Sequence, residues 1–391
     1  MRPGFEMRVA GQSRKKRKPE YSLSWAQVSA FRLRRHYLMN RAVPKLLSAV
    51  VRDVCGIQAQ LMTAAQLALW ARVQYLTPQD IERALWQERA LVKTWCMRGT
   101  LHLLPTEDLS IYIGALRRSG VREVQRWFFK YGLSQGKANM MVEAIVEALA
   151  MGPLTRRELA ERIVSLLGEM SRPWVEHSWG GVAKQAALQG LICFGPNRGQ
   201  EITFIRLDQW LPGLNELSEE EAAKALLRRY LRSYGPASLQ DFSKWAGLVM
   251  KDASSIRDQL GDEVIEVSIE GEPGLLLYED LEWVQTEVSD DQTVCLLPSF
   301  DPYMLGHFDK KHLVDQAHYK EVYRKAGWLS PVVLLGGRVV GTWSYKRHGS
   351  QLSLTVMPFD SLSRVVRNKI KEKAADLGRF LEVTCVVTFS E

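Results

Sequence analysis

Three stretches of the chain repeat one pattern of apolar and polar positions. Each begins with a helix that has a hydroxyl residue at its start and an acid three positions later, continues with further helix, and ends in two short apolar strands. The three helix starts are Thr77 with Asp80, Thr155 with Glu158, and Ser238 with Asp241. At this spacing each side chain can bond the backbone N–H of the other residue, so all three positions predict a capped helix.

A pair of strands follows the helices of each stretch. The predicted pairs are 90–95 with 99–104, 191–194 with 201–207, and 263–269 with 275–278. Helix, helix and hairpin in this order is the winged helix-turn-helix, whose second helix usually enters a DNA groove. Three in tandem predict a long nucleic-acid surface, and the alternative is three small α+β units packed for protein contact.

After about residue 294 the pattern changes to strands, interrupted by one helix at 361–377. The predicted strands are 294–298, 332–335, 338–345, 351–356 and 380–389. Glycines at 336–337 and at 349 allow tight hairpins there. We therefore expect a small β-barrel or curled sheet to close the chain.

The predicted fold class is α+β, with three tandem winged helix-turn-helix motifs followed by a small C-terminal β-barrel. We expect a disordered basic arm at 1–22, winged-helix units at 23–135, 136–212 and 213–285, and the barrel at 286–391. The candidate chemistry lies in the first of these units.

Composition excludes several classes of protein. The 391 residues are 46% hydrophobic, enough for several buried cores, but no apolar run approaches the roughly 20 residues that cross a bilayer. The five cysteines lie far apart without a CxxC pair, which indicates a reducing, cytoplasmic setting. His307, His312 and His318 come closest to a cluster but lack a zinc spacing, so we expect no metal and no cofactor.

The net charge of +8 is concentrated at the N-terminus. Residues 1–20 contain seven Lys or Arg and two Glu, which gives +5 and leaves only +3 for the rest of the chain. Such an arm could follow DNA phosphates, or it could be a solubilising tail or an overextended start. Global basicity is therefore weak evidence for a nucleic-acid partner.

Three local patches are candidates for phosphate contact. Arg118 and Arg122 begin a row of cations that continues every four residues to 130, although Gly120 weakens the helix that would present them. A basic helix is predicted at 364–373. A predicted hairpin tip could enter a minor groove, and it consists of Lys346, Arg347 and His348. A solvated charged face is the alternative for each patch.

Two glutamines follow the helix that ends near Gly56. In an extended segment that buries Ile57 and Ala59 on one side, Gln58 and Gln60 point together to the other. Amides are too weakly basic to remove a proton, but they can orient a water and stabilise positive charge. That help suffices where the leaving group is already activated, as in N7-alkylguanine. By itself a Gln-x-Gln tripeptide is far more often structural.

Further motifs accompany this pair. They are GIQAQ at 56–60, LWAR at 69–72, TWCMRGTLHL at 94–103, SWGG at 178–181, YGPA at 234–237, LPSFDPY at 297–303 and GTW at 341–343. With them the sequence resembles the winged-helix DNA glycosylases that include AlkZ and YcaQ, from about residue 24 to the C-terminus. The resemblance implies three winged-helix motifs and a β-barrel that form a C-shaped cradle for duplex DNA.

The resemblance also implies an activity. The AlkZ-like branch has Gln, an apolar residue and Gln at its catalytic site, whereas the YcaQ-like branch has Asp in place of the second Gln, so Gln60 indicates the AlkZ-like branch. Ala59 is smaller than the spacer we would expect. The chain would be a monofunctional glycosylase in which Gln58 and Gln60 position the hydrolytic water for N7-alkylguanine. The resemblance leaves two points open: whether interstrand crosslinks are a further substrate, and whether the protein serves self-resistance.

Other motif residues are candidates for DNA contact. Arg98, Thr100 and His102 would lie on the first wing, where they could contact the lesion or only build the hairpin. Asp301 and Tyr303 would line the DNA cleft. The expected partner is double-stranded DNA containing alkylated purines, bound by a monomer that does not enter a membrane. The competing functions are a non-catalytic winged-helix transcriptional regulator and a protein-interaction scaffold.

Overall fold

The computed structural model describes residues 21–288 and 291–390. Most of the predicted basic arm therefore lies outside the described residues. Its last two positions, however, begin strand β1 (Tyr21–Leu23), which pairs in parallel with β8 (Val264–Ile269). The prediction that residues 21 and 22 belong to a disordered arm is therefore wrong, because a partner strand far along the chain orders them.

The first repeated segment holds the two glutamines. Helix α1 (Trp25–Arg35) precedes it, and helix α5 (Leu109–Lys130) follows it. Its own elements are α2 (Leu47–Asp53), β2 (Ile57–Gln58), α3 (Met62–Trp70), α4 (Pro78–Trp86), β3 (Leu91–Trp95) and β4 (Leu101–Pro105). The strands form an antiparallel sheet in the order β2-β4-β3.

The second and third segments follow the same plan. The second contains α6 (Gln135–Ala148), β5 (Leu154–Thr155), α7 (Arg156–Leu167), α8 (Arg172–Val175), α9 (Gly181–Leu188), β6 (Ile192–Arg198) and β7 (Glu201–Arg206). The third contains α10 (Leu207–Trp210), α11 (Glu219–Tyr234), α12 (Leu239–Ala246), α13 (Met250–Leu260), β8, β9 (Glu272–Leu277) and α14 (Leu281–Thr286).

The local predictions for these segments are confirmed. Reciprocal capping bonds are present at Thr77, Thr155 and Ser238, and a hairpin follows each helix pair. Each segment runs helix, short strand, helices and hairpin; in the third, a single bridge between Ala237 and Leu275 replaces the short strand. This element order is the one expected of a winged helix.

Helix α5 is unbroken through Gly120, where the sequence predicted a weak point. A Cβ on Gly120 would lie 3.1 Å from Leu188 Cδ2 of α9, so the glycine allows α9 to pack close to α5. Tertiary packing here outweighs the low helix propensity of glycine.

Of the two predicted alternatives, a small β-barrel or a curled sheet, the barrel is wrong, because the C-terminal strands form one open sheet. The order is β10-β11-β12-β13-β14, so β10 and β14 are the two edges of the sheet in the described part of the chain. Its strands are β10 (Val294–Leu297), β11 (Val332–Leu335), β12 (Arg338–His348), β13 (Gln351–Pro358) and β14 (Thr384–Phe389).

Helix α17 (Arg364–Phe380) explains why this sheet stays open. The helix crosses from β13 to β14 and makes that strand pair parallel. Its buried Ile370 and Leu377 belong to the same core as Trp343 and Leu354 of the sheet. Because a helix covers the apolar face, the sheet does not have to curl on itself to bury it.

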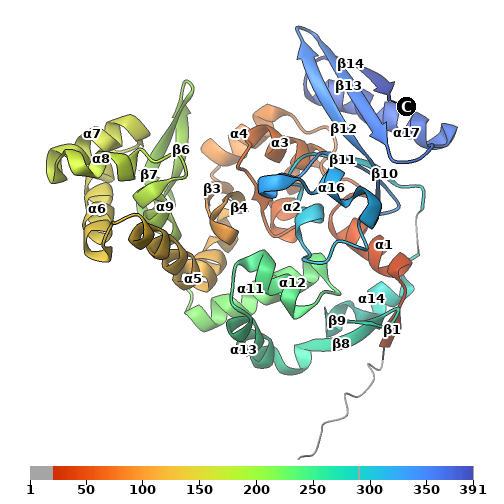
Figure 1. Cartoon of the computed structure of the whole chain (residues 1–391), viewed down its shortest axis with the longest axis horizontal. Helices are drawn as coiled ribbons and strands as arrows, with labels where there is room; N and C mark the ends of the chain where they lie inside the picture. Colours follow the sequence, from red (N-terminus) through yellow and green to blue (C-terminus); the bar gives the residue numbers. More distant parts are fainter. Residues whose placement is uncertain (1–20, 289–290, 391) are drawn as a thin grey trace, which may run out of the picture.

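Figure 1 shows the first segment in the centre of the molecule. The second segment extends to one side beyond α5, the third lies below, and the long β12–β13 hairpin projects at the opposite upper side. One buried core joins residues 42–103 to the C-terminal sheet and α17, so the glutamines lie on a rigid part of the fold. Within the described ranges, no helix has both the length and the apolar character needed to cross a bilayer.

Candidate catalytic site

Gln58 and Gln60 lie on an extended segment between α2 and α3. Ile57 and Ala59 are fully buried, while Gln58 is half-buried and Gln60 is exposed. The alternation predicted from the sequence is confirmed, and both amides are on the outward side. Burial of the intervening side chains fixes the register of this face.

Strand β4 holds this segment in place. The Ala59 N–H donates to the Leu101 carbonyl at 2.7 Å, and the Leu101 N–H donates to Gln60 Oε1 at 3.4 Å. The guanidinium of Arg98 donates from Nη2 to Gln58 Oε1 at 3.3 Å. In residues 21–288 and 291–390 each amide oxygen therefore has one donor, which leaves a second lone pair that can accept a bond from a water.

Arg98 positions Gln58 from the turn between β3 and β4. Its backbone is left-handed, with φ of 55°, and its Nη1 donates to the Trp245 carbonyl of α12. Burial lowers the pKa of Arg98. Thr100 closes the same turn through a 3.1 Å bond from its hydroxyl to the Met97 carbonyl. Arg98 thus links the first and third segments, and both residues build the predicted wing from within.

His102 is buried, which corrects its prediction as a DNA contact. It lies opposite Gln58 in the β2–β4 register, and its Nδ1–H donates to the Thr100 carbonyl at 3.1 Å. Burial and the neighbouring Arg98 charge lower its pKa to about 3, so the ring is neutral in the fold.

This histidine makes stability depend on pH. In the unfolded chain its pKa is about 6.5, so acid protonates the unfolded state but not the folded one until the pH nears the folded value of about 3. Between pH 7 and pH 5, His102 alone should lower the free energy of unfolding by about 2 kcal/mol. Urea titrations of wild type and His102→Asn at both pH values test this. The variant should lose about 2 kcal/mol less on acidification; an equal loss would contradict the assignment.

Asp301 and Tyr303 are also buried, which corrects their predicted place in the DNA cleft. Both Asp301 oxygens accept bonds from the Arg72 guanidinium, at 2.7 and 2.8 Å, in a pair with no solvent exposure. The Tyr303 hydroxyl donates to the Gly337 carbonyl at 3.2 Å. These residues join the first segment to the C-terminal sheet through the interior.

The predicted cations remain at the surface. Arg118 and Arg122 are exposed on α5, but Arg118 lies 3.7 Å from Glu219, and acidic residues share the adjacent cavity. Their local field is thus partly neutralised. The hairpin tip made of Lys346, Arg347 and His348 is exposed at the end of β12.

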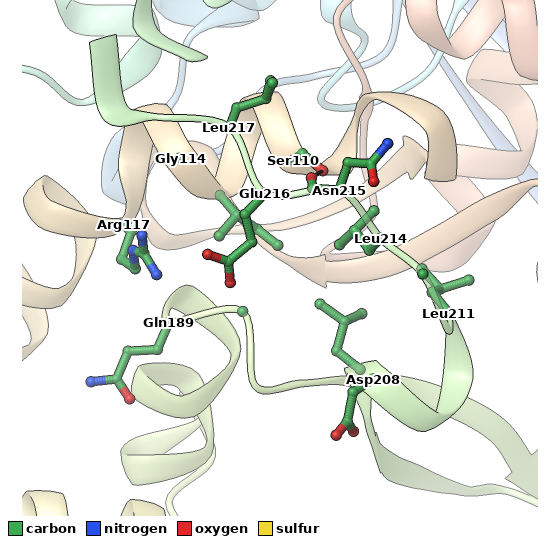
Figure 2. A pocket seen from close by; sticks show the side chains of 14 residues that line it. Ser110, Gly114, Arg117, Gln189, Asp208, Leu211, Leu214, Asn215, Glu216 and Leu217 are labelled. Atoms are coloured by element: carbon green, nitrogen blue, oxygen red, sulfur yellow. Dashed lines mark hydrogen bonds between the residues drawn. The ribbon is translucent and has the colours of Figure 1, made fainter. Parts of the chain in front are cut away.

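Figure 2 shows a cavity where the linker before α11 crosses α5. Arg117, Gln189 and Glu216 surround its opening, and Leu214 lies among its apolar side chains. The lining comes from α5, α10, the α9–β6 turn and the linker, and none of these elements contains the two glutamines. We therefore place the candidate catalytic site on the open surface at β2, away from this cavity.

Other candidate chemistry is limited in the described part of the chain. The rings of His307 and His312 lie 4.8 Å apart, but His318 stacks on Phe359 instead of joining them. No group of three or more His, Cys, Asp or Glu in the described ranges could hold a metal ion. The five cysteines are free thiols.

Sequence reasoning missed one neighbour of the site. Lys184 of α9 packs against the turn that holds Arg98, since a Cβ on Gly99 would lie 2.5 Å from Lys184 Nζ. The only signal was the SWGG motif just before α9, which sequence alone could not connect to this turn.

The mixed α+β fold matches that of a DNA glycosylase whose structure is solved. The chain matches Streptomyces sahachiroi DNA glycosylase AlkZ with a TM-score of 0.83 and 31% identity, over 94% of this chain and 100% of that one. It is also 33% identical over 363 residues to a Streptomyces sahachiroi protein described as an interstrand DNA cross-link repair glycosylase, covering 91% of this chain and 96% of the relative. The family described as DNA glycosylase AlkZ-like matches residues 51–380. The chain therefore belongs to the AlkZ-like family of DNA glycosylases.

Proposed function

We propose that this protein hydrolyses the N-glycosidic bond of N7-alkylguanine in duplex DNA, without lyase activity, using a water positioned by Gln58 and Gln60. The observation that supports this most is the pair of amides on one outward face, each oxygen oriented by a donor from the β3–β4 turn or from β4. Such preorganisation is what a weak catalyst needs, because the groups do not have to reorient as charge develops.

The chemistry divides between the lesion and the protein. Alkylation at N7 gives guanine a positive charge, so the C1′–N9 bond breaks with its electron pair going to a base that leaves neutral. The sugar becomes an oxocarbenium-like cation, which the negative ends of the two amide dipoles stabilise. A water bound to the free lone pairs of the amides then attacks C1′ and loses its proton to solvent. No strong base is required, and neither glutamine could act as one.

The DNA surface that we propose follows from the repeated segments. Acting as winged helices, the three segments would form a C-shaped cradle in which the first segment places the glutamines against the duplex. The exposed β12–β13 tip lies at the far side of the molecule from the second segment, where it would contact a groove or phosphates (Figure 1). A relative named for cross-link repair makes an interstrand crosslink at guanine N7 a second substrate within this proposal.

A glycosylase assay on a defined lesion tests the function. The full chain is incubated with a duplex containing one N7-methylguanine, and abasic sites are converted to strand breaks with alkali. We expect breaks at the lesion only after alkali, and no borohydride-trapped covalent complex with DNA, because a water and not an amine attacks C1′. An unmodified duplex is the control. Breaks no more frequent than in buffer would rule out this activity.

A further inference from the structure

An aromatic cavity lies beside the candidate catalytic site, between α5 and the start of α9. It has a volume of about 130 Å³ and is lined mainly by Val124, Trp127, His177, Trp179 and Lys184. The rings of Trp127 and His177 meet edge to face with centroids 4.7 Å apart. At its rim Trp179 is 73% exposed, a large apolar surface for one side chain to leave in water.

Two glycines hold Trp179 in this exposed place. A Cβ on Gly180 would lie 2.6 Å from the Trp95 ring, and one on Gly181 would lie 1.9 Å from the Trp174 carbonyl. Both glycines also have positive φ, of 102° and 49°. The backbone N–H of Trp179 donates to His177 Nδ1 at 3.2 Å. The backbone around the indole is thus tightly fixed although the indole itself is largely unpacked.

The cavity shares a wall with the turn that orients both glutamines. Lys184 packs on Gly99 of this turn. The residue before Gly99 is Arg98, which donates to Gln58, and two residues after it is Leu101, whose N–H donates to Gln60. The Lys184 side chain and this short turn therefore connect the cavity to both glutamines through a continuous series of contacts.

The chemistry of the lining favours an uncharged ring. A cavity of about 150 Å³ lined with apolar side chains is known to hold one benzene ring, and this cavity is nearly as large. Glu123 lies close enough to Lys184 to offset its charge, so the cavity does not select a phosphate. A nucleobase would bury several donors and acceptors against a mainly aromatic and aliphatic lining, at a cost unless each is paired.

We propose that this aromatic cavity is a specificity subsite that receives a planar aromatic substituent attached to N7 of the damaged guanine. Guanine N7 faces the major groove, so a substituent there projects from the base pair into that groove. Stacking on Trp179 and edge-to-face contact with Trp127 then hold it. This inference rests on the proposed glycosylase function and adds the class of lesion that the enzyme prefers.

The test compares two lesions in the full chain. Single-turnover excision is measured on matched duplexes containing N7-methylguanine or N7-benzylguanine. We expect wild type to excise the benzyl lesion at the higher single-turnover rate at subsaturating enzyme. Trp179→Ala should lose about 10-fold on benzyl, in the range found for removing one stacking aromatic, with methyl nearly unchanged. Trp179→Phe keeps a stacking ring and should restore most of the preference.

Controls separate the outcomes. Phe129→Ala removes an aromatic that is 83% exposed on α5 but does not line the cavity, and it should change neither rate. If wild type excises neither lesion, the glycosylase function and the subsite both fail. If wild type excises both but Trp179→Ala has no effect, or slows both equally because Trp179 contacts the DNA itself, the subsite alone is overturned.

Discussion

Gln58→Ala and Gln60→Ala should each lower single-turnover excision of N7-methylguanine by about 10² to 10³-fold, the usual loss when one preorganised dipole is removed from a transition state. Both side chains reach solvent, and among the described residues each makes one long side-chain hydrogen bond. Their removal should therefore cost little folding stability. The measurement is the rate of alkali-labile strand break formation with enzyme in excess.

The double variant distinguishes shared from separate roles. If both amides position one water, the double variant should lose much less excision rate than the product of the two single losses. The second substitution then acts on a water that the first has already misplaced. Gln209→Ala on α10 is the matched control, because Gln209 is exposed and its side-chain amide donates to the Ala150 carbonyl, away from the candidate site. Loss of duplex binding or of folding in the catalytic variants, instead of loss of turnover, would assign the pair a structural role.

Asp301→Ala should lower the free energy of unfolding by about 3–5 kcal/mol, because it leaves the Arg72 guanidinium charged and unpaired in the interior. The pair has no exposure, and residues 229 positions apart in the chain form it. Urea unfolding followed by fluorescence measures the loss. Replacing Arg72 with Met and Asp301 with Leu together should recover part of it, since no buried charge then remains.

A surface ion pair provides the comparison. Asp208 binds Arg206 but is largely exposed, so Asp208→Ala should leave the unfolding midpoint almost unchanged. A similar small effect at Asp301 would show that water reaches the Arg72 pair.

The sequence predicted best what neighbouring residues decide. The capped starts at Thr77, Thr155 and Ser238 depend on groups three positions apart, and the outward face of Gln58 and Gln60 depends on the two-residue period of a strand. Both signals can be read in a window of a few residues, and the structure confirms both. The central part of the candidate site was therefore accessible from sequence.

The predictions that were wrong depend on contacts between residues far apart in the sequence. The sequence around Asp301 is typical of a polar loop, and only the three-dimensional structure shows that Asp301 forms a buried ion pair with Arg72. The parallel return of β14 by way of α17 similarly turns a predicted barrel into an open sheet. The link from Arg98 to Trp245 across two segments has no local pattern. Long-range pairs of this kind do not alter the periodicity from which elements are predicted.

The parallel pairing of β1 with β8 has a consequence for how the protein is made on the ribosome. The backbone N–H of Trp25, just after β1, bonds the Glu270 carboxylate 245 residues later. At a synthesis rate of roughly 5 to 20 residues per second, strand β1 must wait roughly 12 to 50 s before its partner is translated. During that time the hydrogen-bonding groups of this segment are unpaired and can pair with strands of other chains.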